Sequence, residues 1–261
     1  MATLDEFDGL LIDLDGVVWI GRELVPGSVE ALRSLLDAGM AIVFVTNNPG
    51  KPASEYARRL TDAGVEVGAE QIVTAGEATA SLAAERSPGG TAFTIGGRAF
   101  HDTIVTAGLR LLEGEAGREA DAVLVSGHRG FDYDELLTAT LALQRGAALF
   151  ATSRDPTLPM PGGPWPGTGA VLAAVETASG ATAEIGGKPE PHLFEMARER
   201  ISAAEQVAMV GDRVSSDIEG GRRAGLETIL VLSGASSRAE AEGAVHPPDR
   251  IVADLAALAR R

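Results

Sequence analysis

Residues 9–15 read Gly-Leu-Leu-Ile-Asp-Leu-Asp and are the most informative segment about the fold. A short apolar run that ends in polar residues predicts a strand buried on both faces. Side chains two apart on a strand share a face, so Asp13 and Asp15 start close together at its end. Further strands are predicted at residues 41–46, 71–75, 206–210, 228–232 and 250–252, and helices at 25–38, 53–63 and 216–224. This alternation predicts an α/β fold with a doubly wound parallel sheet.

The middle of the chain repeats the alternation with its own turns. Strands are predicted at residues 91–95, 122–125 and 147–152, and helices at 99–107, 132–144 and 170–179. A Pro- and Gly-rich stretch at 156–169 predicts a long loop, which in compact domains is usually functional or mobile. We therefore expect a core domain from residues 1–78 and 185–261, with a second α/β domain inserted at 79–184.

Composition excludes several classes of protein. The 261 residues are 45% hydrophobic and 23% charged, which is ordinary for a globular chain with a sizeable core. The net charge of −15 repels polyanions, so no nucleic-acid partner is expected. The chain contains no Cys, which excludes disulfides and thiolate metal sites. No apolar run is long enough to span a membrane, and the acidic start lacks the basic residues of a secretory signal. We expect a cytoplasmic protein without a membrane partner.

Polar residues follow four apolar segments of the expected core. In an open α/β sheet, ligands bind where the carboxyl ends of the strands meet, so these residues should converge on one crevice. Each motif alone is more typical of a turn, a helix cap or a solvated loop, but four in this order are hard to attribute to chance. The candidates are Asp13, Asp15, Thr46, Asn47, Asn48, Lys188, Asp212 and Asp217.

The chemistry of this set indicates a phosphoryl site. Carboxylates crowded together must take up protons or bind a cation. Oxygen ligands without nearby Cys or His favour Mg²⁺. Lys188 adds a second positive charge, while Thr46 and the two Asn residues offer neutral donors to an anion. Metal, lysine and neutral donors around carboxylates suit phosphoryl transfer.

The same residues resemble the four motifs of the haloacid dehalogenase superfamily. They read DLDGV at 13–17, TNN at 46–48, GKPEP at 187–191 and GDRVSSDI at 211–218. The stretches VPGSVEAL at 25–32 and ATSRDPTLPMPGGPWPGTG at 151–169 resemble subfamily IIA, whose members carry a type-C2 cap. The resemblance covers nearly the whole chain and implies a doubly wound core with an inserted α/β cap.

The resemblance also implies a role for each residue. Asp13 corresponds to the nucleophile that forms an aspartyl-phosphate, and Asp15 to the general acid and base. Mg²⁺ would be held by Asp13, Asp212 and the backbone carbonyl of Asp15, with Asp217 acting through water. Thr46 and the Asn residues would bind phosphoryl oxygens, and Lys188 would neutralise them. One departure is Ser153, which stands where the subgroup usually has Asn.

The expected activity is Mg²⁺-dependent hydrolysis of a small phosphorylated metabolite, most readily glycerol 3-phosphate or 2-phosphoglycolate. Arg154 and Asp155 could contact a polar leaving group, and Leu158 offers no hydrogen bond to a pyridine ring. The alternative substrates are pyridoxal 5′-phosphate and nucleoside monophosphates.

Three other functions remain open. A carbon–halogen hydrolase needs neither an acid at Asp15 nor magnesium. A phospho-receiver module is about half as long, and a non-catalytic binding protein has no need of the full motif set. A homodimer formed through the cap is a further expectation.

Overall fold

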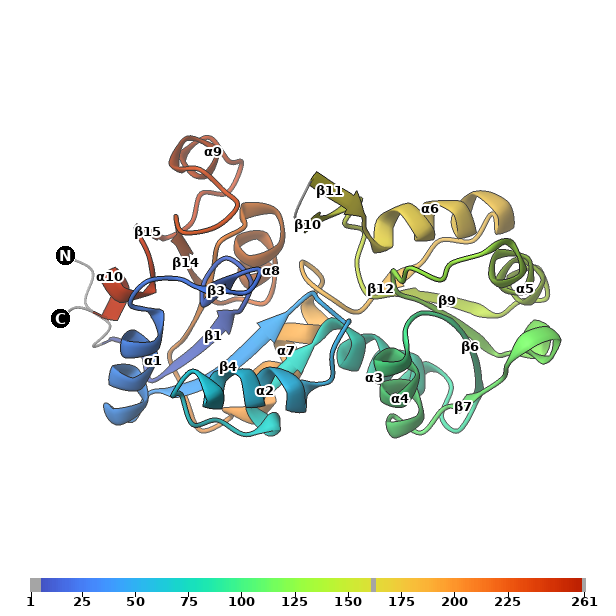
Figure 1. Ribbon diagram of the computed structural model, residues 1–261, viewed down its shortest axis with the longest axis horizontal. Helices are drawn as coiled ribbons and strands as arrows, with labels where there is room; N and C mark the ends of the chain where they lie inside the picture. Colours follow the sequence, from blue (N-terminus) through green and yellow to red (C-terminus); the bar gives the residue numbers. More distant parts are fainter. Residues whose placement is uncertain (1–5, 161–162, 260–261) are drawn as a thin grey trace. The chain divides into compact units, whose positions relative to one another are not determined.

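The computed structural model describes residues 6–160 and 163–259, which form two compact units (Figure 1). The core unit contains Met1–Thr46, Ala53–Val73 and Lys188–Arg261. The inserted unit contains Asn47–Pro52 and Thr74–Gly187. Each unit has its own sheet. The core unit is discontinuous in sequence, because the inserted unit lies between its N-terminal and C-terminal segments.

A six-stranded sheet forms the centre of the core unit, in the order β15-β14-β13-β1-β4-β5. The pairs from β15 to β4 are parallel. The first strand along the chain lies inside the sheet, and the order reverses beside it, which confirms the predicted doubly wound fold. The strands are β1 (Gly9–Asp13), β4 (Ala41–Thr46), β5 (Ile72–Thr74), β13 (Val207–Gly211), β14 (Glu227–Val231) and β15 (Arg250–Val252).

Helices cover both faces of this sheet, which explains why its strands are continuous apolar runs. On one face, Leu10 and Ile12 of β1 pack with buried residues of α1 (Ser28–Asp37), α2 (Ala53–Asp62) and α10 (Leu255–Ala259). The opposite face is contacted by α7 (Pro191–Arg200) and α8 (Glu219–Arg223). A short hairpin, β2 (Trp19–Ile20) with β3 (Glu23–Leu24), follows β1, and α9 (Arg238–Glu242) follows β14.

The inserted unit contains a five-stranded sheet in the order β12-β9-β8-β6-β7, with parallel pairs throughout. Apolar residues of α3 and α4 cover one face, and those of α5 and α6 cover the other. The predicted strand segments 91–95 and 122–125 match β6 and β8. The elements are α3 (Ala75–Arg86), β6 (Thr91–Ile95), α4 (Arg98–Thr106), β7 (Arg110–Leu111), β8 (Ala122–Val125), α5 (Tyr133–Gln144), β9 (Ala148–Ala151), α6 (Thr168–Ser179) and β12 (Glu184–Ile185).

Residues 156–169 were expected to form a loop, and that expectation is wrong for most of the stretch. Thr157–Met160 (β10) and Gly163–Pro166 (β11) pair as an antiparallel hairpin; residues 161 and 162 lie outside the described part of the chain. Pro159 stands opposite Pro164. Proline has no amide hydrogen, so it is tolerated in a strand only at positions that donate no hydrogen bond to the neighbouring strand. Both strands of this two-stranded ribbon are edge strands, which offer such positions.

The predicted helix at 216–224 has a different form. It begins as a π-helical turn over Val214–Ile218 and continues as α8. Among the described residues, no helix combines the length and apolar character needed to cross a bilayer.

Candidate active site

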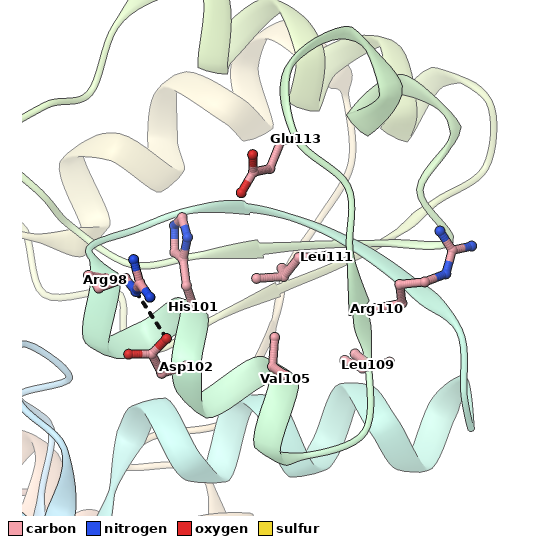
Figure 2. Close-up of a pocket in the computed structure, with 8 residues that line it drawn as sticks. All are labelled: Arg98, His101, Asp102, Val105, Leu109, Arg110, Leu111 and Glu113. Carbon is pink, nitrogen blue, oxygen red and sulfur yellow. Dashed lines mark hydrogen bonds and ion pairs between the residues drawn. The ribbon is translucent and has the colours of Figure 1, made fainter.

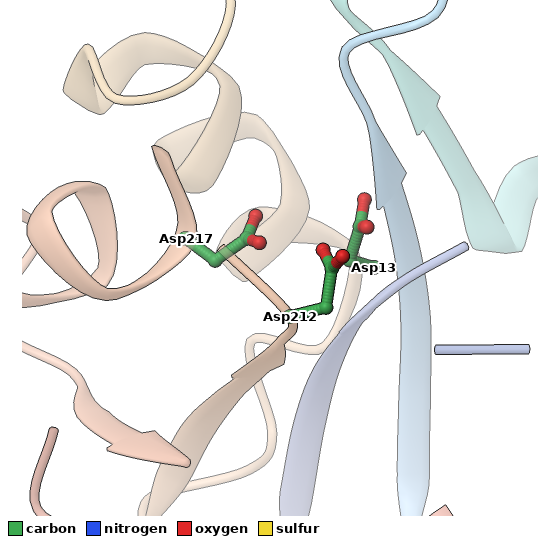
Figure 3. Close-up of side chains that lie close together, drawn as sticks. All are labelled: Asp13, Asp212 and Asp217. Atoms are coloured by element: carbon green, nitrogen blue, oxygen red, sulfur yellow. The ribbon is translucent and has the colours of Figure 1, made fainter. Parts of the chain in front are cut away.

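Three aspartates converge at the carboxyl ends of β1 and β13 (Figure 3). Asp13 is the last residue of β1, Asp212 directly follows β13, and Asp217 lies in the π-helical turn. One carboxylate oxygen from each lies within 4.8 Å of the other two, and all three side chains are buried. Neighbouring parallel strands end at the same edge of the sheet, and this brings together Asp13 and Asp212, which are 199 positions apart in the sequence. We refer to Asp13, Asp212 and Asp217 as the carboxylate cluster.

Lys188 joins two members of the carboxylate cluster. Its Nζ donates to Asp13 Oδ1 and to Asp217 Oδ1, each at 2.6 Å. The lysine side chain is 2% exposed, so these charge-assisted bonds lie in a region from which water is largely excluded. An ammonium in such a place needs ionised partners. Lys188 therefore fixes the orientation of Asp13 and opposes the negative charge around it.

Backbone amides fix the two later aspartates. Asp217 Oδ2 accepts a hydrogen bond from the Arg213 amide at 3.0 Å, so both of its oxygens have protein partners. Asp212 Oδ2 accepts from the Ala235 amide at 2.6 Å. Asp217 is thus held mainly by hydrogen bonds within the protein, whereas Asp13 and Asp212 are the cluster members better placed to bind another group.

Glycines make room for this arrangement. A Cβ on Gly16 would collide with the Asp212 carboxylate, and so would a Cβ on Gly234. Gly16 also has φ of +91°, a conformation that side-chain-bearing residues rarely adopt. Its carbonyl accepts a hydrogen bond from Ser233 Oγ at 2.7 Å. The turn after β1 is therefore fitted tightly against Asp212.

Burial shifts the titration of the cluster. Burial raises the pKa of Asp13 well above its usual value; Lys188 opposes this effect, and the charges of Asp217 and Asp212 add to it. Burial and the nearby Asp217 raise the pKa of Asp212 to about 6. Burial lowers the pKa of Lys188, but Asp13 and Asp217 outweigh that effect and hold the pKa above its ordinary value. Three carboxylates surround one ammonium, so the site carries a net negative charge when all three carboxylates are ionised.

A divalent metal ion fits this donor set. The cluster offers several oxygens within the span of one coordination sphere, and such hard ligands suit Mg²⁺. The raised pKa values of Asp13 and Asp212 show that ionising the cluster without a cation is costly. Asp13 and Asp212 would hold the ion, with Asp217 behind them.

Asp15 differs from the cluster because it is exposed. It lies two residues beyond β1, and its Oδ1 accepts a hydrogen bond from Trp19 Nε1 at 3.0 Å. Sequence reasoning missed Trp19, although it is one of only two Trp in the chain and lies four residues after Asp15. It also missed the close fit of Gly16 and Gly234, because contacts between distant loops leave no local pattern.

Thr46 is the last residue of β4 and is buried. It lies one position beyond Val45, which pairs with Asp13 across the sheet. Asn47 and Asn48 follow in the inserted unit and are half-buried, and Asn48 Oδ1 accepts from the Gly50 amide at 3.0 Å. The predicted role of all three in phosphoryl binding stays a prediction.

The residues of the inserted unit chosen from the sequence have other partners. Arg154 donates twice to Glu176, at 2.9 and 3.0 Å, and once to the Ala183 carbonyl. The Asp155 amide donates to Ser153 Oγ at 3.3 Å, so Ser153 stabilises its own turn. The structure describes only the strand position of Leu158. The predicted substrate contacts stay predictions.

A hollow of about 540 Å³ is present in the inserted unit and contains none of the predicted site residues (Figure 2). Arg98 and Asp102 on its rim form an ion pair at 3.1 Å, and His101 bonds to the Gly96 carbonyl. Its lining mixes both charge signs with apolar side chains. Nothing in this lining selects one class of ligand.

Comparison of the sequence and the structure with known proteins gives the same family as the motifs. A family model described as haloacid dehalogenase-like hydrolase matches residues 10–110, and a second, HAD-hydrolase-like model matches residues 185–258. A relative from Rattus norvegicus, chronophin, is 39% identical over 251 residues, which are 92% of this chain and 81% of that protein. The chain belongs to the haloacid dehalogenase-like hydrolases.

Two further matches come from Mycobacterium tuberculosis. A D-glycerol 3-phosphate phosphatase is 37% identical over 262 residues, covering 98% of this chain and 72% of that protein. A crystal structure of a glycerol phosphate phosphatase in complex with magnesium has a TM-score of 0.90 and 35% identity. That match covers 99% of this chain and 78% of the other. The sequence-based assignment to this superfamily is confirmed.

Proposed function

We propose that this haloacid dehalogenase-like hydrolase is a phosphatase of small phosphate monoesters, with Asp13 as nucleophile. The observation that carries the proposal is the position of Asp13 at the end of a central strand, bonded to Lys188 and beside Asp212. A carboxylate held by a fixed ammonium and surrounded by further carboxylates is arranged to meet a bound cation and a phosphoryl group together. The magnesium-bound relative supports this arrangement.

The chain's own residues account for a two-step reaction. A carboxylate oxygen of Asp13 attacks phosphorus, and the bond from phosphorus to the ester oxygen breaks. Asp15 donates a proton to the departing alkoxide, which is a poor leaving group without one. Water then attacks the phosphorus of the aspartyl-phosphate and gives a proton to Asp15. The bond between Asp13 and phosphorus breaks, which frees inorganic phosphate and returns Asp13 to a carboxylate. Asp15 is then protonated again, as it was at the start.

Two positive charges assist this chemistry. Lys188 orients Asp13 and offsets charge on the transferring phosphoryl group. Mg²⁺, held by Asp13 and Asp212 with support from Asp15 and Asp217, would supply electrostatic stabilisation of phosphoryl oxygens. Thr46, Asn47 and Asn48 would donate to those oxygens.

We propose that the inserted unit serves as the type-C2 cap, which excludes bulk solvent and large substrates while the hydrolytic water is admitted. The net charge of −15 also disfavours polyanionic substrates. A contact between Arg154 and substrate would require its guanidinium to leave Glu176. The cytoplasmic location and the homodimer through the cap stay predictions, and sedimentation analysis tests the second.

For the substrate, we propose glycerol 3-phosphate or 2-phosphoglycolate, with support from the relative named for glycerol 3-phosphate. The test compares kcat/KM with Mg²⁺ on these two esters, pyridoxal 5′-phosphate, a nucleoside monophosphate and a folded phosphoprotein. We expect one of the two small aliphatic esters to be the best substrate and the phosphoprotein to be the worst. A clear preference for pyridoxal 5′-phosphate would overturn the substrate assignment but leave the phosphatase intact.

A further inference from the structure

Trp19 is the partner of the exposed Asp15 carboxylate. The indole Nε1 donates to Asp15 Oδ1 at 3.0 Å. The backbone closes the same turn, because the Gly16 amide donates to the Trp19 carbonyl at 2.7 Å and the Trp19 amide donates to the Leu14 carbonyl at 3.2 Å. The hydrogen bond is therefore made within a short, closed segment that starts at the end of β1.

The indole ring is held by two side chains of α2. Trp19 is completely buried and stacks on Tyr56 of α2, with ring centroids 6.4 Å apart and planes 8° from parallel. The Arg59 guanidinium, one helical turn further along α2, lies 3.9 Å from the indole centroid. Arg59 Nη2 also donates to the Gly21 carbonyl at 2.8 Å, which ties the cation to the β2–β3 turn. A ring fixed by stacking and by a cation–π contact has little freedom to turn.

An indole N–H can donate a hydrogen bond but cannot accept one. Asp15 Oδ1 must therefore act as the acceptor of this bond whether the carboxyl group is ionised or protonated. In a protonated carboxyl group the carbonyl oxygen is the stronger acceptor, so this contact favours Oδ2 as the oxygen that carries the proton. The contact thus selects one of two chemically equivalent oxygens and fixes the rotation of the carboxyl group.

We propose that Trp19 is a positioning residue for proton transfer by Asp15, and that Arg59 keeps its indole in place. This inference rests on the proposed function. In the first step, the proton on Asp15 Oδ2 passes to the ester oxygen as the phosphorus–oxygen bond breaks. In the second step, the attacking water returns a proton to Oδ2. The indole keeps its hydrogen throughout, so atoms and charges balance without another reactant.

The kinetic test uses Trp19→Phe, which keeps an aromatic ring for stacking and removes the N–H donor. Single turnover of glycerol 3-phosphate needs a proton on the leaving group, so we expect its rate to fall by about 10- to 100-fold. The first release of nitrophenolate from p-nitrophenyl phosphate needs no such proton, and we expect that burst rate to change by less than about threefold. Steady-state turnover of the same ester should fall, because the water step still uses Asp15.

Arg59→Met loosens the ring without removing the donor. We expect a smaller loss than in Trp19→Phe, again concentrated in the steps that need a proton. Equal fractional losses for both esters and for burst and steady state would mean that Trp19 acts only in folding, and would overturn the proposal. Unchanged kinetics on both esters would also overturn it.

A spectroscopic test separates this inference from the proposed function, because it needs no turnover. The chain contains two Trp, so two indole N–H signals are expected in a ¹H–¹⁵N spectrum. Removing the acceptor with Asp15→Ala should shift the Trp19 signal upfield and speed its exchange with solvent, while the Trp165 signal stays in place. An unmoved Trp19 signal would overturn the proposal whatever the enzyme hydrolyses. Inactivity of the wild type on every ester, with the shift present, would instead refute the proposed function.

Discussion

The ammonium of Lys188 lies 2.6 Å from Asp217 Oδ1, and both side chains are almost completely buried. The other oxygen of Asp217 accepts from the Arg213 amide. Asp217 therefore stabilises the lysine and the turn after β13, and Lys188 in turn orients Asp13. Removing one partner of a buried ion pair typically costs about 3–5 kcal/mol, because it leaves the other charge unpaired.

This division between the aspartates predicts different effects on metal binding. Asp217→Ala should weaken Mg²⁺ binding by about 10- to 100-fold, as expected for a supporting residue, and should lower the melting temperature. Asp212→Ala should weaken Mg²⁺ binding more. Isothermal titration with Mg²⁺ measures both, with Asp37→Ala, an exposed change on α1, as control. A greater loss of affinity in Asp217→Ala would reverse the assignment.

Asp13→Asn should abolish turnover, because an amide cannot form the covalent intermediate. We expect kcat to fall by more than about 1000-fold. Rapid acid quenching with ³²P-labelled ester should detect a phosphoenzyme in the wild type and none in the variant. Turnover close to that of the wild type in Asp13→Asn would rule out the covalent mechanism.

Asp15→Asn should separate the steps that need a proton from those that do not. Loss of a general acid typically costs about 100- to 10,000-fold, so single turnover of glycerol 3-phosphate should be strongly slowed. The nitrophenolate burst from p-nitrophenyl phosphate should lose much less, since nitrophenolate leaves without a proton. Rapid-quench and stopped-flow measurements give the two rates, and equal losses would contradict a proton-transfer role.

The stabilisation by Mg²⁺ should depend on pH. Without metal, the pKa of Asp212 in the folded protein is about 6, above its ordinary value of 3.8. The folded state therefore holds this proton more tightly than the unfolded chain, so the associated stability is present below about pH 4 and is lost as the pH rises through 6. Mg²⁺ must displace that proton at low pH.

We accordingly expect Mg²⁺ to raise the melting temperature more at pH 7.5 than at pH 5.0. Thermal unfolding at one fixed Mg²⁺ concentration measures the difference, with metal-free samples at both pH values as references. An equal or larger shift at pH 5.0 would contradict the predicted competition.

Gly16 offers a test with a matched control. Gly16→Ala combines a strained φ of +91° with a collision between its Cβ and the Asp212 carboxylate. Gly39 has a similar φ of +84°, but a Cβ there meets nothing within 4 Å. Gly39→Ala should cost about 1 kcal/mol of stability and leave kcat unchanged, whereas Gly16→Ala should also lose Mg²⁺ affinity and activity. Equal behaviour of the two variants would show that backbone strain alone matters.

Part of the fold was predictable because the inner strands of both sheets are buried on two faces. Such strands are uninterrupted apolar runs, so residues 41–46, 91–95 and 122–125 were placed at their exact limits. The α3 and α7 helices were not predicted. α3 is rich in Ala and has no clear apolar stripe. α7 begins at Pro191, a residue that ordinarily signals a break but suits the first helical turn.

Polar residues after apolar runs are a local pattern, so the order of residues along the chain was enough to predict which chemical groups stand at the ends of the core strands. The sequence therefore predicted the α/β class and the group of acidic residues with Lys188, and the resemblance of its motifs indicated the family. Only the tertiary structure decided the pairings: Lys188 with Asp13 and Asp217, Gly16 against Asp212, Arg154 with Glu176, and Trp19 with Asp15. Those pairings depend on side-chain directions and on strand and loop packing, which a pattern along the chain does not specify.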